Sequence, residues 1–294
     1  MSHPFLILIP AHNEAATIAS VVSRCRSLSS EVLVVDDGSV DSTGSAASAA
    51  GARVLRTEQC KGYGSALRLG FEECKRLQSS IVITLDGDGT HDPQSVPSLL
   101  SAHLKSQANL TIGSRFLNSE FAGAVPHAKA AANFFATTLF NSATHSSFTD
   151  VASGMRAIDR SALDLECEIT TFGFTYEYLA AARRRGMRIA ETGISVHYNA
   201  ETILSTSRIE LSDFLASIIS IADGSNGRLR DALDHMHEIV STSQILRVSA
   251  GGKHIIAHPV PHIDAYIFQI QDPYFITEGP QRNWIHWTSI DKKE

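Results

Sequence analysis

Two aspartates one residue apart lie in the stretch TLDGDGTHDP, residues 84–93, directly after a short apolar run. That run, SIVIT at 80–84, is rich in β-branched residues and predicts a buried strand. Asp86 and Asp88 would then stand where the strand ends, and open α/β sheets bind ligands outside the carboxyl ends of their strands. Paired carboxylates there suit a hard cation such as Mg²⁺ or Mn²⁺. Because Asp and Gly also form ordinary turns, the motif alone leaves both interpretations open.

A second acidic pair lies in VVDDGSVDST, residues 34–43, again at the end of an apolar run. Asp36 and Asp37 cannot hold a phosphate, but their oxygens can accept hydrogen bonds from a nucleobase N–H or a ribose hydroxyl. The alternative is structural, with Asp37 shaping the turn and Asp41 capping the helix that follows.

Two further loops carry weaker signals. Glu14, in IPAHNEAATI at 9–18, falls in the first turn of a predicted helix, where an acidic residue suits the helix dipole. Lys61 precedes a glycine-spaced turn in KGYGSAL at 61–67, where its charge and the backbone N–H groups could meet a phosphate. Neither a P-loop nor a G-x-G-x-x-G motif is present, so ordinary ATPase and NAD-binding interpretations are weak.

These motifs need a fold in which strand ends converge. Strands and helices alternate through the first 115 residues, which predicts an α/β domain with a mostly parallel sheet and helices on both faces. The predicted strands are 5–10, 31–37, 52–56, 80–85 and 108–116, and the predicted helices are 14–28, 41–51, 64–77 and 93–104.

The second half of the chain departs from this alternation. SGMRAIDR at 153–160, a helix at 174–185 and the segment 187–198 predict a return to the sheet. From about residue 225 short strands separated by turn residues, namely QILRVSA, KHIIAHPV and AYIFQI, predict a small β-rich appendage. We therefore divide the chain into a domain at 1–224 and an appendage at 225–294, whose role the sequence does not indicate.

Bulk composition excludes several classes of protein. The 294 residues are 43% apolar and 19% charged, with a net charge of −6, so no basic field indicates nucleic-acid binding. The four cysteines are scattered, which favours reduced thiols in a cytoplasmic protein. We find no signal peptide and no run of 18 apolar residues, so no transmembrane span is expected, although peripheral contact with a membrane is compatible with this.

Taken together and in order, the motifs resemble those of family 2 glycosyltransferases, most closely the branch of dolichol-phosphate mannose synthase and related polyprenyl-phosphate glycosyltransferases. The resemblance covers roughly residues 4–200. The segments that carry it are ILIPAHNEAATI, EVLVVDDGSVDST, KGYGSALRLGF, ITLDGDGTHDP, IGSRF, DVASGMRAIDR and GFTYEYLAAARRRGMRIAETGISV. It implies a GT-A fold, which is a nucleotide-binding α/β domain with a metal-binding D-x-D motif.

The resemblance implies a nucleotide site at the first strand ends. It places Lys61 and Gly62 near the nucleotide and gives Asp36 a supporting role. The positions that it implies for the nucleoside pocket are Pro10, Ala11, Glu14 and Asp37.

The resemblance also makes Asp86 and Asp88 the D-x-D pair, with Asp88 the more direct ligand of Mg²⁺ or Mn²⁺ and Asp86 nearer the ribose or sugar. Relatives often have Gln or Ser two residues after the second Asp, whereas this chain has Thr90, which puts a third metal contact there in doubt. Arg115 and Arg156 match arginines expected near the transferred sugar and the acceptor phosphate, and Glu177 matches an acidic position of the same site.

The implied activity is inverting transfer of a hexose from a GDP- or UDP-sugar to an acceptor. Family members that glycosylate hydroxyl groups usually carry a TED-like acid as general base, and this chain has no such triplet. An ionised acceptor phosphate needs no base, so we expect a polyprenyl or dolichyl phosphate, although Asp150 or Glu177 could supply a base. The alternatives are a soluble hydroxyl acceptor, or a degenerate regulatory subunit that binds sugar nucleotides. An oligomer is compatible with the sequence.

Overall fold

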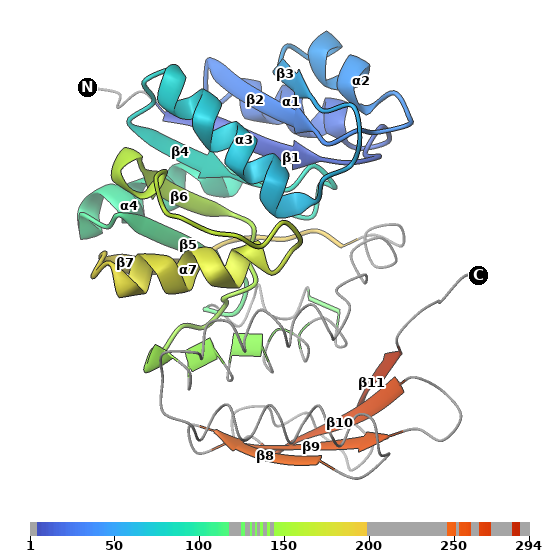
Figure 1. Ribbon diagram of the computed structural model, residues 1–294, viewed down its shortest axis with the longest axis vertical. Helices are drawn as coiled ribbons and strands as arrows, with labels where there is room; N and C mark the ends of the chain where they lie inside the picture. Colours follow the sequence, from blue (N-terminus) through green and yellow to red (C-terminus); the bar gives the residue numbers. More distant parts are fainter. Residues whose placement is uncertain are drawn as a thin grey trace.

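The computed structural model describes residues 5–117 and 144–198, a few positions from 125 to 141, and four strands from 246 to 288. Strands and helices alternate through the first part of the chain, as predicted (Figure 1). The elements up to the fifth strand are β1 (Phe5–Ala11), α1 (Ile18–Arg26), β2 (Glu31–Asp36), α2 (Thr43–Ala49), β3 (Arg53–Arg56), α3 (Tyr63–Arg76), β4 (Ile81–Thr84), a 3-10 helix (Pro93–Ser95), α4 (Val96–Ser106) and β5 (Leu110–Ser114). They are followed by β6 (Arg156–Asp159), a 3-10 helix (Arg160–Ala162), α7 (Phe174–Arg184) and β7 (Ile189–Gly193).

These strands form one seven-stranded sheet in the order β3-β2-β1-β4-β6-β5-β7. All neighbouring pairs are parallel except those of β6, which runs antiparallel to both β4 and β5. The predicted mostly parallel α/β sheet is therefore confirmed, with one reversed strand inside it.

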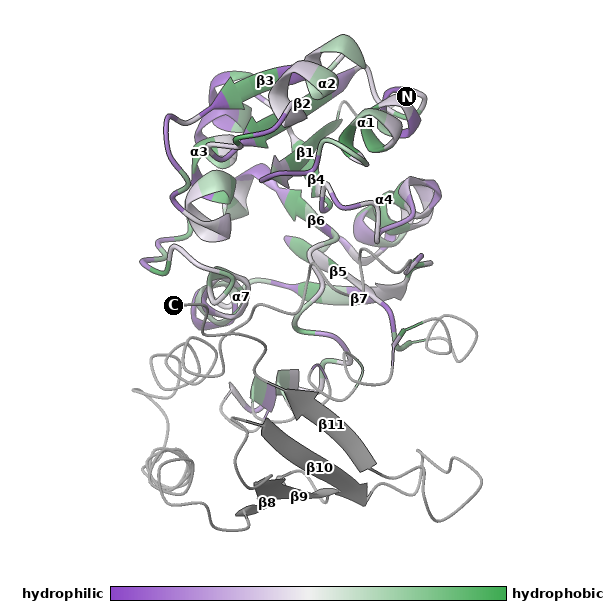
Figure 2. Ribbon diagram, turned by 90° about the vertical axis from the view of Figure 1, so that its right-hand side faces the viewer, coloured by the Kyte–Doolittle hydropathy of each residue, from purple (hydrophilic) through white to green (hydrophobic). Residues whose placement is uncertain are grey.

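Alternating side chains of the central strands pack into two separate cores, one on each face of the sheet. In β1, Leu6 and Leu8 pack with α3 and α7, whereas Ile7 and Ile9 point to the opposite face and pack with α1, α2 and α4. Because both faces are covered, β1 is apolar along its whole length. Figure 2 shows α3 and α7 on one side of the sheet and α1 and α4 on the other.

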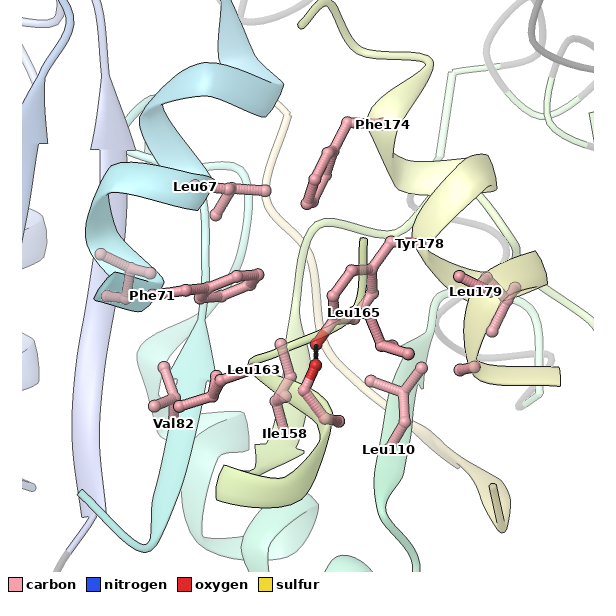
Figure 3. Packing of buried hydrophobic residues seen from close by; sticks show 14 of the residues in the cluster. Leu67, Phe71, Val82, Leu110, Ile158, Leu163, Leu165, Phe174, Tyr178 and Leu179 are labelled. Atoms are coloured by element: carbon pink, nitrogen blue, oxygen red, sulfur yellow. Dashed lines mark hydrogen bonds between the residues drawn. The ribbon is translucent and has the colours of Figure 1, made fainter. Parts of the chain in front are cut away.

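The core beneath α3 and α7 is built around aromatic rings (Figure 3). Tyr178 lies 5.5 Å from Phe71 of α3 and 5.4 Å from Phe174, measured between ring centroids. The Tyr178 hydroxyl donates to the carbonyl oxygen of Ala162 at 2.7 Å, so its polar atom is satisfied inside the core. This packing fixes α7, which carries the predicted site residue Glu177.

The parallel arrangement of β1, β2 and β4 brings their carboxyl ends to one edge of the sheet. The segments that follow these three strands contain Glu14, the Asp36–Asp37 pair and the Asp86–Asp88 pair. Thus the alternation read from the sequence gathers the predicted acidic positions at one edge.

The C-terminal strands form a second sheet, antiparallel and in the order β11-β10-β9-β8. Their bounds are β8 (Leu246–Ala250), β9 (Lys253–Pro259), β10 (Ala265–Gln271) and β11 (Trp284–Thr288). The first three were predicted and the fourth was not. The division of the chain at residue 224 and the role of the appendage stay predictions. Within the part of the chain that the structure describes, no helix has the length and apolarity needed to cross a membrane.

Candidate active site

The second aspartate of the D-x-D pair sits in a closed turn. Asp88 is only 6% exposed, and each of its carboxylate oxygens accepts a hydrogen bond from Thr90. The Thr90 backbone N–H donates to Oδ1 at 2.8 Å and the Thr90 hydroxyl donates to Oδ2 at 2.8 Å. Gly89 between them has φ of 78°, a left-handed conformation that glycine adopts without steric cost.

The first aspartate, Asp86, packs against three other residues. The Tyr63 hydroxyl donates to its Oδ1 at 3.2 Å, and Nδ1 of His91 lies 3.4 Å from Oδ2. Gly154 supports the carboxylate from a third side, since a Cβ at that position would lie 2.5 Å from Oδ1. Burial raises the pKa of Asp86, and the neighbouring charge of Asp88 adds to the rise while His91 opposes it.

Glu14 adds a third carboxylate to this region. Burial raises its pKa to about 7, and repulsion from Asp88, Asp86 and Asp41 adds to the effect, while a hydrogen bond from Thr17 opposes it. The Thr17 hydroxyl is 3.3 Å from Glu14 Oε2. The site therefore concentrates negative charge at the ends of β1 and β4.

These residues fit a divalent cation. The repulsion that Asp88 exerts on Glu14 and Asp86 is relieved when a cation binds between them, and oxygen is the donor that Mg²⁺ and Mn²⁺ prefer. Among the described residues, no cluster of three or more His, Cys, Asp or Glu could hold a metal by itself. The D-x-D pair would thus supply only part of the coordination, which suits an ion whose other ligands are diphosphate oxygens and water.

The Asp36–Asp37 pair holds the neighbouring loop. Asp37 is buried and accepts hydrogen bonds from the backbone N–H groups of Lys61 at 3.0 Å and Gly62 at 2.7 Å, and from the Thr57 hydroxyl at 3.1 Å. Asp36 pairs with Arg56 at 2.6 Å. The structure thus gives both carboxylates a role inside the protein, and a contact of Asp37 with the nucleoside stays a prediction.

The remaining residues predicted for the nucleotide lie around this loop. The carbonyl oxygen of Ala11 accepts from the Asp37 N–H at 2.9 Å, which ties the end of β1, including Pro10, to the end of β2. Lys61 is exposed. Gly62, the N-cap of α3, lies against Thr170, so that a Cβ at Gly62 would meet the Thr170 carbonyl oxygen at 2.6 Å.

Arg115 is held by a buried carboxylate. Its Nε and Nη2 donate to Asp150 at 2.7 and 2.8 Å, and its Nη1 donates to the Tyr198 hydroxyl at 3.3 Å. Burial alone would lower the pKa of Arg115, but the Asp150 carboxylate raises it above its usual value. Arg115 also lowers the pKa of Asp86, so the guanidinium lies within electrostatic range of the D-x-D pair.

Arg156 lies in the interior. Its guanidinium donates to the carbonyl oxygens of Ser153, Thr175 and Val151, at 3.0, 3.1 and 2.9 Å. Burial lowers its pKa. These bonds fix the turn that carries Gly154, and Gly154 packs against the Asp86 carboxylate. Arg156 therefore supports Asp86 indirectly, and its contact with sugar or phosphate stays a prediction.

Glu177 holds a second loop. Its oxygens accept from the backbone N–H groups of Glu168 at 3.0 Å and Ile169 at 2.9 Å. The next residue, Thr170, accepts from the N–H of Gly64 at 2.7 Å. The loop anchored by Glu177 therefore meets the start of α3, directly after the loop anchored by Asp37.

The sequence matches the model of glycosyl transferase family 2 over residues 6–165. This segment contains the D-x-D turn and the loop anchored by Asp37. The chain belongs to glycosyl transferase family 2. It is a glycosyltransferase, and its mostly parallel α/β sheet agrees with the fold class predicted from the resemblance.

Two curated relatives illustrate the range of this family 2 branch. The chain is 34% identical over 184 residues to glycosyltransferase AglJ of Haloferax volcanii, a match that covers 62% of this chain and 59% of AglJ. It is 28% identical over 237 residues to polyprenol monophosphomannose synthase of Mycolicibacterium smegmatis, covering 76% of this chain and 88% of that enzyme. The predicted resemblance to polyprenyl-phosphate glycosyltransferases is thereby confirmed.

A solved structure shows the GT-A fold. Glucosyl-3-phosphoglycerate synthase of Mycobacterium tuberculosis, in complex with Mn²⁺, UDP and glucosyl-3-phosphoglycerate, superposes with a TM-score of 0.58 and 24% identity. The match covers 76% of this chain and 81% of that chain. A divalent metal thus occurs with a nucleotide in this fold.

Two residues of the candidate site escaped the sequence analysis. Tyr63 and His91 both contact Asp86, and both lie in segments that the analysis quoted without singling them out. His91 is buried, and its Nε2 has no hydrogen-bond partner within the described structure. The sequence signal that could have identified these two residues was their position, since His91 follows the D-x-D pair by three residues and Tyr63 follows Lys61 by two.

Proposed function

We propose that this family 2 enzyme transfers a hexose with inversion from a nucleotide sugar, of the GDP-mannose or UDP-glucose type, to a polyprenyl or dolichyl phosphate. The observation that carries the proposal is the convergence of Glu14, Asp86 and Asp88 at one sheet edge, where burial, together with repulsion from Asp88, raises the pKa of Glu14 and Asp86. Such a site favours a bound divalent cation and, through it, a diphosphate.

The donor half of the reaction follows from this charge. Mg²⁺ or Mn²⁺ bound at Asp86 and Asp88 would neutralise the charge that grows on the diphosphate leaving group. Tyr63 and Gly154 hold Asp86, and Thr90 holds Asp88, so the carboxylates are oriented before the donor arrives. The loop that Asp37 anchors presents Lys61 beside the same edge, where its ammonium can attract the nucleotide.

The acceptor half rests on the two carboxylates that could have acted as a base. Asp150 is fully buried and bound by Arg115, and Glu177 accepts two backbone N–H groups. Both carboxylates are therefore occupied by contacts within the protein. An ionised phosphate oxygen can attack the anomeric carbon without deprotonation, and the bond from that carbon to the diphosphate breaks on the opposite side. The similarity to polyprenol monophosphomannose synthase of Mycolicibacterium smegmatis supports such an acceptor.

The first test is thermal unfolding with GDP, UDP, GDP-mannose and UDP-glucose, each with and without Mn²⁺. A ligand at 100 times its dissociation constant should stabilise the fold by about 2.7 kcal/mol. We expect one base to give a Mn²⁺-dependent shift that Asp88→Ala abolishes. The matching donor is then supplied with a short polyprenyl phosphate, and formation of glycosyl polyprenyl phosphate is followed by mass spectrometry. No shift with any nucleotide would contradict the donor assignment.

A soluble hydroxyl acceptor is the second candidate, and Glu14 favours it. A carboxyl with a pKa of about 7 can accept a proton at neutral pH, as a general base must. The test replaces polyprenyl phosphate by 3-phosphoglycerate, because related structures were solved with phosphoglyceric acid. If the enzyme glycosylates this acceptor and Glu14→Gln abolishes the reaction, the acceptor is assigned as a hydroxyl group and no longer as a lipid phosphate.

A further inference from the structure

The structure gives the short side chain of Thr90, two residues after the second aspartate of the D-x-D pair, a definite partner. The Thr90 hydroxyl and backbone N–H each donate to a different oxygen of Asp88, both at 2.8 Å. Thr90 is 5% exposed and Asp88 is 6% exposed, so water competes little for either bond. The two residues form a closed pair around Gly89.

Thr90 is itself fixed from outside this turn. Its carbonyl oxygen accepts from the N–H of His197 at 2.8 Å, and the adjacent His91 forms a β-bridge with Val196. The N–H of Asp92 donates to the Ser195 carbonyl oxygen at 3.2 Å. The turn is therefore clamped against the chain that follows β7, and the hydroxyl of Thr90 has a defined position.

The geometry leaves Asp88 able to bind a cation. An ionised carboxylate offers about four acceptor sites. Thr90 occupies one on each oxygen, which leaves a lone pair on each oxygen for another ligand. Rotation of the carboxylate about its Cβ–Cγ bond would break both bonds to Thr90, so the pair holds one orientation.

We propose that Thr90 is a positioning residue that fixes the Asp88 carboxylate in the orientation in which it binds the divalent cation. The proposal rests on the proposed function, because it assumes that Asp88 is a metal ligand. Thr90 acts through Asp88: its hydroxyl proton is directed at the carboxylate. The side-chain hydroxyl is the group that matters, since any residue except proline at position 90 keeps the backbone donor.

The test compares Thr90→Val, which has nearly the shape of threonine but lacks the hydroxyl, with Thr90→Ser, which keeps it. Thr90→Ala repeats the loss of the hydroxyl in case the valine variant does not fold, and Asp88→Ala removes the carboxylate. Free Mn²⁺ is followed by electron paramagnetic resonance during titration of each protein in the presence of UDP, and again with GDP. Thermal unfolding without metal checks that each variant is folded.

Loss of a group that orients a metal ligand typically weakens metal affinity by about 10- to 100-fold. We expect Thr90→Val and Thr90→Ala to weaken Mn²⁺ binding to this extent and Thr90→Ser to stay within about threefold of the wild type. Mn²⁺ binding by folded Thr90→Val as tight as that of the wild type would overturn the inference. So would a serine variant as weak as the valine variant. If wild-type protein binds no Mn²⁺ with either nucleotide, the proposed function fails and the inference fails with it.

Discussion

Asp150 and Arg115 form a bidentate ion pair inside the protein, with Nε and Nη2 of the arginine 2.7 and 2.8 Å from the two carboxylate oxygens. The backbone N–H of Arg115 donates to the same carboxylate at 3.0 Å. On the other side, Glu191 accepts from the N–H of Asp150 at 3.2 Å and of Thr149 at 2.9 Å. Arg115 is therefore oriented by the fold before any substrate arrives.

Removal of Asp150 should be strongly destabilising, because it leaves the Arg115 guanidinium without its buried counter-charge. Breaking a buried pair from one side typically costs about 3–5 kcal/mol. We expect Asp150→Ala to lower the free energy of unfolding in urea by about this amount. The matched control is Asp164→Ala, which removes an exposed partner of Lys75 and should cost less than about 1 kcal/mol. Equal losses in the two variants would show that the pair adds nothing through burial.

Asp37→Ala should release the loop at 57–62. The carboxylate is the acceptor for the N–H groups of Lys61 and Gly62, so both amides lose their partner. We expect hydrogen exchange of these two amides to accelerate and stability to fall by about 1–3 kcal/mol. The amide of Ile169, held by Glu177, is the internal control and should keep its protection. Unchanged exchange at Lys61 and Gly62 would show that Asp37 does not hold the loop.

The convergence of the acidic segments was predictable because it needs only the order of strands and helices. Once β1, β2 and β4 are parallel neighbours, Glu14, Asp37 and Asp88 must follow strand ends at one edge. The direction of the strands in the second half of the chain was harder to predict from the sequence. Nothing in the apolar pattern of β6 distinguishes a parallel from an antiparallel strand, and its place between β4 and β5 depends on long-range pairing.

The hydrogen-bond partners of individual charged groups could not be predicted from the motifs. Glu177 is bound by two amides that lie eight and nine residues earlier in the chain, and Arg156 by three carbonyl oxygens, two from the segment 151–153 and one from Thr175 of α7. A resemblance predicts which residue types recur near a site, whereas these contacts depend on loop conformation. The same limit hid Tyr63, whose contact with Asp86 joins α3 to the end of β4.

Glu14 should make the metal-free protein less stable as the pH rises. Its pKa is about 7 in the folded protein against an ordinary value of 4.5, so the folded state keeps a proton that the unfolded chain loses. The stabilisation is complete below pH 4.5 and is lost as the pH rises to about 7.

Urea unfolding in the presence of a chelator, at several pH values in this window, measures the effect. We expect the stability of Glu14→Gln to decline less over the window than that of the wild type, because glutamine does not titrate. Glu72→Gln, at an exposed glutamate on α3, serves as the control and should follow the wild type. Parallel pH profiles for Glu14→Gln and the wild type would contradict the raised pKa.

Gly154→Ala should displace Asp86 and so weaken metal-dependent binding. The added methyl group would lie 2.5 and 2.7 Å from the two carboxylate oxygens, which is too close for either to remain in place. Gly70→Ala is the matched control, since its Cβ would meet the side chain of Leu8 in the core, at 2.5 Å, and not an aspartate. Overpacking of this kind typically costs about 1–3 kcal/mol, so both variants should unfold at lower temperature.

The two variants should separate when Mn²⁺ and the selected nucleoside diphosphate are added. Gly70→Ala should recover the full Mn²⁺-dependent rise in unfolding temperature, because its carboxylates are undisturbed. Gly154→Ala should recover little of it, since one of its two aspartates no longer faces the ion. A full Mn²⁺-dependent rise in Gly154→Ala would mean that Asp86 is dispensable for the metal, and coordination would then rest on Asp88 and the diphosphate.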